Sequence, residues 1–111
     1  MYQDAKRLRQ YVRILLKKFT AEERYVIADQ INRSCLSIML TIAEGSAKKS
    51  DKDFARFLEM AIASANEVVA GFDAACDDGI ITATEYTKAE QDAEHVVRQL
   101  GGFLKTLISK S

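Results

Sequence analysis

Residues 50–79 read SDKDFARFLEMAIASANEVVAGFDAACDDG, and this stretch decides the fold. Its apolar side chains recur every three or four residues, which places them on one face of a helix. Ser50 at its start is a favourable N-cap, and Gly79 at its end can take the left-handed conformation that terminates a helix. The apolar stripe consists of Phe54, Phe57, Leu58, Ala61, Ala65, Val68, Phe72 and Ala75. We therefore predict one long amphipathic helix that buries a single side.

The same periodicity appears on both sides of this helix. It covers residues 4–19, then a stretch ending near Ala47, and finally residues 82–108. The sequences Thr20-Ala21-Glu22-Glu23 and Thr82-Ala83-Thr84-Glu85 have the spacing of a capping box and predict the starts of the second and fourth helices. Because the connections are short, successive helices must run antiparallel. The sequence thus predicts a single all-α domain, an antiparallel up-down four-helix bundle.

Composition supports long helices. The 111 residues include no proline and only five glycines, whereas strands and turns need more of both. The weak point is Gly101-Gly102 within the fourth helix, where each glycine costs about 1 kcal/mol relative to alanine. We expect the pair to bend the helix or to let a neighbour approach closely.

Charge is balanced overall but unevenly distributed. Residues 1–56 contain twelve Lys and Arg against seven Asp and Glu, and residues 57–111 contain four against nine. A uniformly basic nucleic-acid binder is therefore excluded, and a site for RNA, DNA or another polyanion would lie in the first half. The candidate residues lie opposite the apolar stripe of the first helix: Lys6, Arg9, Arg13 and Lys17. Alternatively, this basic face pairs with the acidic fourth helix of a neighbouring subunit.

The second helix is too apolar for a monomer. In residues 35–43, CLSIMLTIA, apolar side chains occupy nearly every angle around the helix. Leu36, Met39 and Leu40 cannot all face the bundle core, and an exposed apolar patch usually marks a protein interface. On the third helix, Met60, Ile62 and Val69 also fall outside the main stripe. We therefore predict a homo-oligomer with Leu36, Met39 and Leu40 at its interface.

The sequence shows no pattern that indicates catalysis. His95 is the only histidine, so the Glu-x-x-His motif of a bundle di-metal site cannot occur twice, and Asp92 three residues earlier is better explained by a solvated helix face. Cys35 and Cys76 lie in apolar helical stretches and are expected to be reduced core residues. We expect no catalytic, cofactor or metal site, and hence no enzyme.

Two acidic residues interrupt apolar sequence. Glu44 and Glu67 each lie beside core positions, and a buried carboxylate must be paired. Arg33 and Arg56 are the nearest basic residues to the core. We predict an internal ion pair of Arg33 with Glu67 or Glu44 that fixes the helix register. The functional alternative is a ligand or nucleic-acid site.

The cellular location follows from what the sequence lacks. The N-terminal residues contain no apolar run of the kind found in signal peptides. The longest apolar-rich stretch, Cys35–Ala43, is too short to cross a membrane. We expect a cytoplasmic protein without membrane association.

Two blocks of sequence resemble a known family. ADQINRSCLSI at residues 28–38, followed by TIAEG at residues 41–45, resembles the signature of the 23S rRNA intervening-sequence proteins. FARFL at residues 54–58, with Ala61 and ASANE at residues 63–67, is similar to that family's second block. Thr41, Asn32 and Ala63 replace residues that the family usually has as asparagine, arginine and glycine.

The resemblance implies a four-helix bundle and extends to the accessory variability-determinant proteins of diversity-generating retroelements. Those form homopentamers and are thought to bind nucleic acid and a reverse transcriptase. The resemblance therefore implies a pentamer. The function expected is a non-catalytic oligomeric scaffold that binds RNA or another polyanion through the first helix. The alternative is a protein-only adaptor, for example an accessory subunit of a reverse transcriptase.

Overall fold

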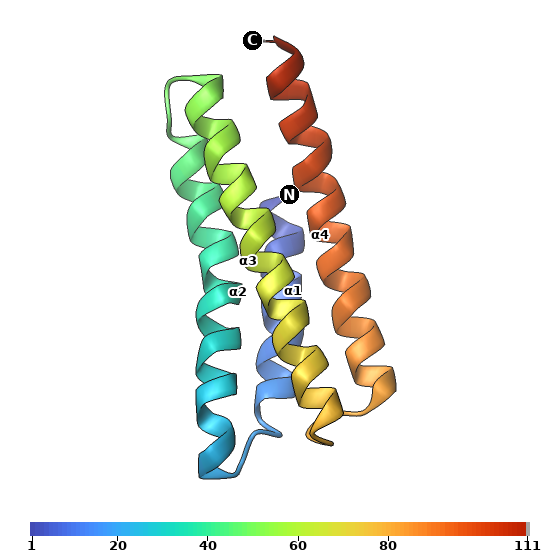
Figure 1. Ribbon diagram of the computed structural model, residues 1–111. Helices are drawn as coiled ribbons and strands as arrows, with labels where there is room; N and C mark the ends of the chain where they lie inside the picture. Colours follow the sequence, from blue (N-terminus) through green and yellow to red (C-terminus); the bar gives the residue numbers. More distant parts are fainter. Residues whose placement is uncertain (111) are drawn as a thin grey trace.

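The computed structural model describes residues 1–110, apart from the side chains of Glu23 and Lys110, and within them it contains four α-helices and a short 3-10 turn. These are α1 (Tyr2–Leu16), η1 (Glu22–Arg24), α2 (Tyr25–Ser46), α3 (Asp51–Asp77) and α4 (Ala83–Lys110). Each helix runs antiparallel to the one before it (Figure 1). The predicted all-α antiparallel four-helix bundle is confirmed.

The helices enclose one core. α1 and α3 each pack against both α2 and α4, so α1 and α3 lie diagonally opposite one another. The predicted stripes point inward, and every helix contributes fully buried side chains. The largest are Leu8, Leu15, Ile31, Ile38, Leu58, Phe72 and Leu100. Burial of these apolar side chains is the main force that holds the bundle together.

Local signals explain where α3 and α4 begin. The Ser50 hydroxyl accepts a hydrogen bond of 3.1 Å from the backbone N–H of Asp53, as an N-cap should. At the start of α4, the Thr82 hydroxyl accepts from the Glu85 N–H at 3.1 Å, while the Glu85 carboxylate accepts from the Thr82 N–H at 2.9 Å. This is the reciprocal pattern of the predicted capping box. Between the two helices, Gly79 has a φ of +74°, which only glycine adopts easily.

The start of α2 differs from the prediction. The helix begins at Tyr25, after η1, and its N-cap residue Arg24 makes no side-chain cap. The other half of the predicted Thr20 capping box is the side chain of Glu23, which lies outside the described residues. A 3-10 turn therefore leads into α2, whose N-cap Arg24 lies four residues after the predicted N-cap Thr20.

The helices differ greatly in length, and this shapes one end of the bundle. α1 has 15 residues and α4 has 28. Asp4 in the first turn of α1 already lies level with His95 of α4, 3.4 Å apart. Beyond that level α4 continues to Lys110 alongside α3, with α2 on the far side of α3 (Figure 1). The bundle thus has four helices at one end and three at the other.

Candidate interaction surfaces

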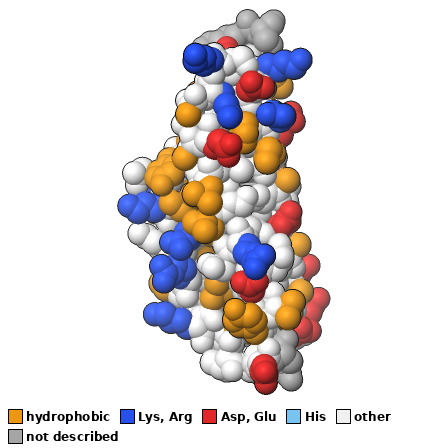
Figure 2. Space-filling view, turned by 90° about the vertical axis from the view of Figure 1, so that its left-hand side faces the viewer, with side chains coloured by type: hydrophobic (Ala, Val, Ile, Leu, Met, Phe, Trp, Pro, Cys, Tyr) orange, Lys and Arg blue, Asp and Glu red, His pale blue; other side chains and the backbone are white. Residues whose placement is uncertain are grey.

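The outer face of α2 carries exposed apolar side chains along a single line. Val26, Leu36 and Leu40 have exposed fractions of 74%, 37% and 59%. Their positions, together with Asp29 and Arg33 between them, follow the three- and four-residue spacing of one helix face. Figure 2 looks onto this side of the molecule and shows apolar side chains gathered across its middle. We call the residues Val26, Asp29, Arg33, Leu36 and Leu40 the α2 face.

Not every apolar residue outside the predicted stripes is exposed. Met39 is half-buried and packs against the core, so it lies at the border of the α2 face instead of at its centre. Ile62 and Val69 are likewise half-buried against the core. Met60 is exposed, as expected. The apolar excess is therefore smaller than the sequence indicated, but Leu36 and Leu40 remain outside the core.

The prediction that Arg33 forms an internal ion pair with Glu67 or Glu44 is wrong. The Arg33 Nε lies 3.0 Å from an Asp29 carboxylate oxygen one turn earlier on the same helix, and the Arg33 side chain is 74% exposed. Glu44 is exposed and lies 3.9 Å from the Lys48 Nζ at the end of α2. The cause is helical geometry, because position 33 shares a face with Asp29 and points away from the core.

The polar contact between α2 and α3 is made by serine instead. The Ser34 hydroxyl donates to a Glu67 carboxylate oxygen at 2.9 Å, and a second contact joins the Ser64 and Ser37 hydroxyls at 3.1 Å. Ser34 is itself buried and also accepts from the Gln30 amide at 3.3 Å. The signal that could have revealed this seam was the three-residue spacing of Ser34 and Ser37 in α2 and of Ser64 and Glu67 in α3. The carboxylate of Glu67 thus helps to fix the register, with no basic partner among the described side chains.

The basic face of α1 is smaller than predicted. Lys6, Arg13 and Lys17 are exposed, and none of them forms an ion pair with a described side chain. Arg9 differs, since it is half-buried and its Nε is buried without a hydrogen-bond partner in the described chain. Arg9 lies one turn from buried Ala5 and Val12, so it borders the core instead of facing away from it. We call Lys6, Arg13 and Lys17 the basic face.

Other charged residues join α1 and the residues just after it to α4. Lys18 forms an ion pair with Glu85, and the Lys88 Nζ lies 4.2 Å from the centre of the Tyr11 ring. His95 meets Asp4 at the other end of this seam. His95 therefore belongs to a surface contact between two helices, as its place on a solvated face suggested.

The two cysteines are free thiols. Burial raises the pKa of the Cys35 thiol to about 11, although nearby Arg9 acts in the opposite direction. A thiol with such a pKa is protonated at neutral pH and is a poor nucleophile. Cys35 is thus a core residue as predicted, and Cys76 is half-buried.

Comparison with known proteins agrees with the two sequence blocks. The model of the family described as 23S rRNA-intervening sequence protein matches residues 1–102. The chain belongs to this family. A solved structure, a protein with unknown function from the S23 ribosomal protein family of Bacteroides thetaiotaomicron, is 25% identical with a TM-score of 0.86, over 94% of this chain and 97% of that one. A comparison with curated proteins found no match.

The blocks that resemble the intervening-sequence protein family lie on facing helices. Residues 28–45 belong to α2 and residues 54–67 to α3. Ser34 and Glu67, which are joined by a hydrogen bond, come from different blocks. In this member of the family, both blocks therefore contribute to the seam between α2 and α3. Within residues 1–110, no helix has the length and apolar character needed to span a membrane.

Proposed function

We propose that this intervening-sequence family protein is a non-catalytic subunit of a cytoplasmic homo-oligomeric scaffold, assembled through the α2 face. The observation that carries the proposal is the exposure of Leu36 and Leu40 at positions one turn apart. Covering such side chains contributes about 25 cal/mol for each Å² of apolar surface removed from water. The α2 face lies in the middle of one side of the bundle, where a second copy has access along its length (Figure 2).

A pentamer is the assembly we propose. The number five rests on the resemblance to the accessory variability-determinant proteins, and the link to that group is part of the proposal. Apolar residues provide the attraction, and the Arg33–Asp29 ion pair in the middle of the α2 face provides a polar contact that favours one register.

The scaffold is proposed to bind RNA or another polyanion through the basic face of α1. Figure 2 shows a column of Lys and Arg side chains along one edge of the α2 side. On this face one chain offers three cations, Lys6, Arg13 and Lys17, none of which pairs with a described acidic side chain, and this is a small patch. Because phosphate contacts add up and several copies act together, assembly would turn a weak contact into an avid one. RNA binding in this proposal therefore depends on the oligomer.

A second candidate function is a protein-only adaptor without nucleic-acid contact. It is favoured by the acidic side chains at the opposite edge of the same side (Figure 2). A neighbouring copy can bring this acidic edge against the basic face and neutralise it. In that arrangement the remaining partner would be a protein, for example a reverse transcriptase.

A gel-shift titration at low salt, combined with light scattering, tests the proposal. The variant Arg13→Glu with Lys17→Glu reverses two of the three charges of the basic face, and Arg98→Glu with Lys105→Glu makes the same charge change on exposed positions of α4. We expect wild type and the α4 variant to shift RNA of any sequence, with affinity that falls steeply as salt rises, and the α1 variant to lose the shift while keeping its mass. If the α1 variant dissociates instead, the adaptor is favoured. If wild type gives no shift at micromolar concentrations, the polyanion role is excluded.

A further inference from the structure

The end of α4 is set apart from the rest of the helix by two glycines. Gly101 and Gly102 lie within α4, beyond the level reached by α1, and residues 103–109 follow them. The family model ends at Gly102, so these residues lie outside the matched part of the chain. We call residues 103–109 the strap.

Neither glycine is required by the packing. A Cβ added at Gly101 or at Gly102 would meet no atom within 4 Å, so the expected close approach of a neighbour does not occur. Both residues have ordinary helical backbone angles, because Gly79 is the glycine with positive φ in the described chain. A glycine inside a helix costs about 1 kcal/mol relative to alanine. The pair therefore weakens α4 at this point without a local structural reason.

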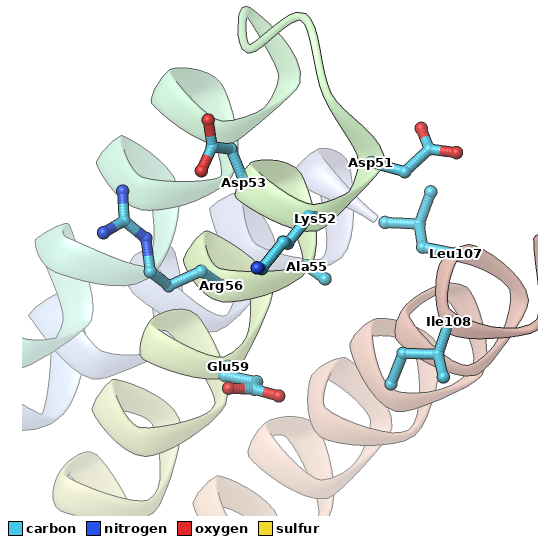
Figure 3. A pocket seen from close by; sticks show the side chains of 8 residues that line it. All are labelled: Asp51, Lys52, Asp53, Ala55, Arg56, Glu59, Leu107 and Ile108. Carbon is cyan, nitrogen blue, oxygen red and sulfur yellow. The ribbon is translucent and has the colours of Figure 1, made fainter. Parts of the chain in front are cut away.

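One side chain of the strap is buried among the described residues. Leu107 is its buried side chain, Leu104 is half-buried, and the rings of Phe103 and Phe54 lie 5.3 Å apart. Figure 3 shows Leu107 and Ile108 on α4 opposite the start of α3, at a shallow groove that Lys52 and Ala55 also line. In addition, the Thr106 hydroxyl donates to the Gly102 carbonyl at 3.1 Å, a contact that tends to bend helices. The preceding part of α4 is anchored by four buried side chains, Ala89, Ala93, Val96 and Leu100.

We infer that the strap is a hinged cover that swings away from α3 about Gly101-Gly102. In the closed position it shields the three-helix end of the core, where Phe54 and Leu58 of α3 lie. In the open position the Phe54 ring and the Leu107 side chain become accessible, and an apolar surface appears at an end of the molecule remote from the basic face. Local opening of a few weakly held turns needs far less free energy than global unfolding. The inference is independent of the function proposed above.

Hydrogen–deuterium exchange of the full chain, followed by NMR, tests this hinge. We expect the strap amides to exchange at least about tenfold faster than those of residues 93–100 in the same helix. Replacing both glycines in Gly101→Ala with Gly102→Ala should slow exchange of the strap by about tenfold or more, since alanine restores helix propensity. Exchange of residues 93–100 should stay unchanged.

Two further variants make the test specific. Leu107→Ala should speed exchange of the strap and leave residues 93–100 unchanged, because it removes the buried anchor. Thr87→Ala, an exposed helix-favouring change near the start of α4, should leave the strap unchanged. The hinge is ruled out if the wild-type strap is as protected as residues 93–100. It is equally ruled out if the double alanine variant leaves strap exchange as fast as in wild type.

Discussion

Gly45 of α2 lies directly against Phe57 of α3. A Cβ at position 45 would come within 2.7 Å of the Phe57 Cβ and within 3.0 Å of the Phe54 ring. The Phe57 Cβ is attached to the backbone of α3, so the overlap cannot be relieved by rotating a side chain. Gly45 is the last residue of the first block that resembles the family, and it sets how closely α2 approaches α3.

We therefore predict that Gly45→Ala destabilises the bundle. Overpacking costs about 1–3 kcal/mol, and the better helix propensity of alanine offsets about 1 kcal/mol of that loss. Gly102→Ala is the matched control, because a Cβ there meets nothing within 4 Å and should leave stability equal or higher. Urea denaturation at equal protein concentration gives the unfolding free energy of each variant relative to wild type. Equal midpoints for Gly45→Ala and wild type would show that α2 and α3 can separate at little cost.

A second prediction concerns acid stability. Glu85 links α1 to α4, and the Lys18 ammonium holds the pKa of this carboxyl below its usual value near 4.5, with help from the Thr82 N–H. A carboxyl whose pKa is lower in the folded state stabilises the fold above its unfolded pKa, and this contribution is lost as the pH falls through the folded pKa. We expect the unfolding free energy of wild type to decline below about pH 4.5 and the decline to be shallower in Glu85→Gln.

The control for this prediction is Glu94→Gln, which changes an exposed glutamate further along α4. Its denaturation midpoints between pH 7 and pH 3 should follow those of wild type. An identical acid dependence for Glu85→Gln and wild type would mean that the pair with Lys18 does not stabilise the fold.

The fold was predictable because local signals and apolar periodicity agree. The stripe in α3 and the caps at Ser50, Thr82 and Gly79 lie where the sequence indicated. The start of α2 was not predictable, since η1 comes before it and its N-cap residue Arg24 makes no side-chain cap. Propensity alone does not distinguish a 3-10 turn from the first turn of an α-helix.

The candidate surfaces were predictable only in part. Leu36 and Leu40 are exposed, as expected for a helix with more apolar residues than the core can bury. Met39 instead packs against the core. The contacts of the charged residues were harder to predict. A long side chain can reach several partners, and the sequence does not show which partner it contacts. Arg33 forms its ion pair with Asp29 one turn away, and Arg9 borders the core beside Ala5 and Val12. The partner that a charged side chain contacts depends on its angular position around the helix. Differences smaller than the rotation between two successive residues are enough to change that partner.

The third prediction is that Leu40→Asp dissociates the assembly. Leu40 and Ile14 have the same exposed fraction of 59%, but Ile14 lies on α1, outside the α2 face. If the α2 face is the interface, Leu40→Asp places an unpaired charge within it and Ile14→Asp does not. Light scattering should give a mass near 12.4 kDa for Leu40→Asp and a multiple of this mass for Ile14→Asp. A wild-type mass near 12.4 kDa at micromolar concentration would contradict the oligomer.

The last prediction concerns Arg33, whose partner Asp29 is one turn away on the surface. In the Leu40→Asp background, where assembly does not contribute, Arg33→Ala should lower the unfolding free energy by no more than about 1 kcal/mol, as for other exposed pairs. Removing one partner of an internal pair would cost about 3–5 kcal/mol, and a loss of that size in urea denaturation would contradict the surface position. Arg98→Ala on exposed α4 is the control for loss of a positive charge. In the wild-type background Arg33→Ala should also weaken the assembly, because Arg33 lies between Val26 and Leu36 on the α2 face. The difference between the two backgrounds measures how strongly this pair is coupled to association.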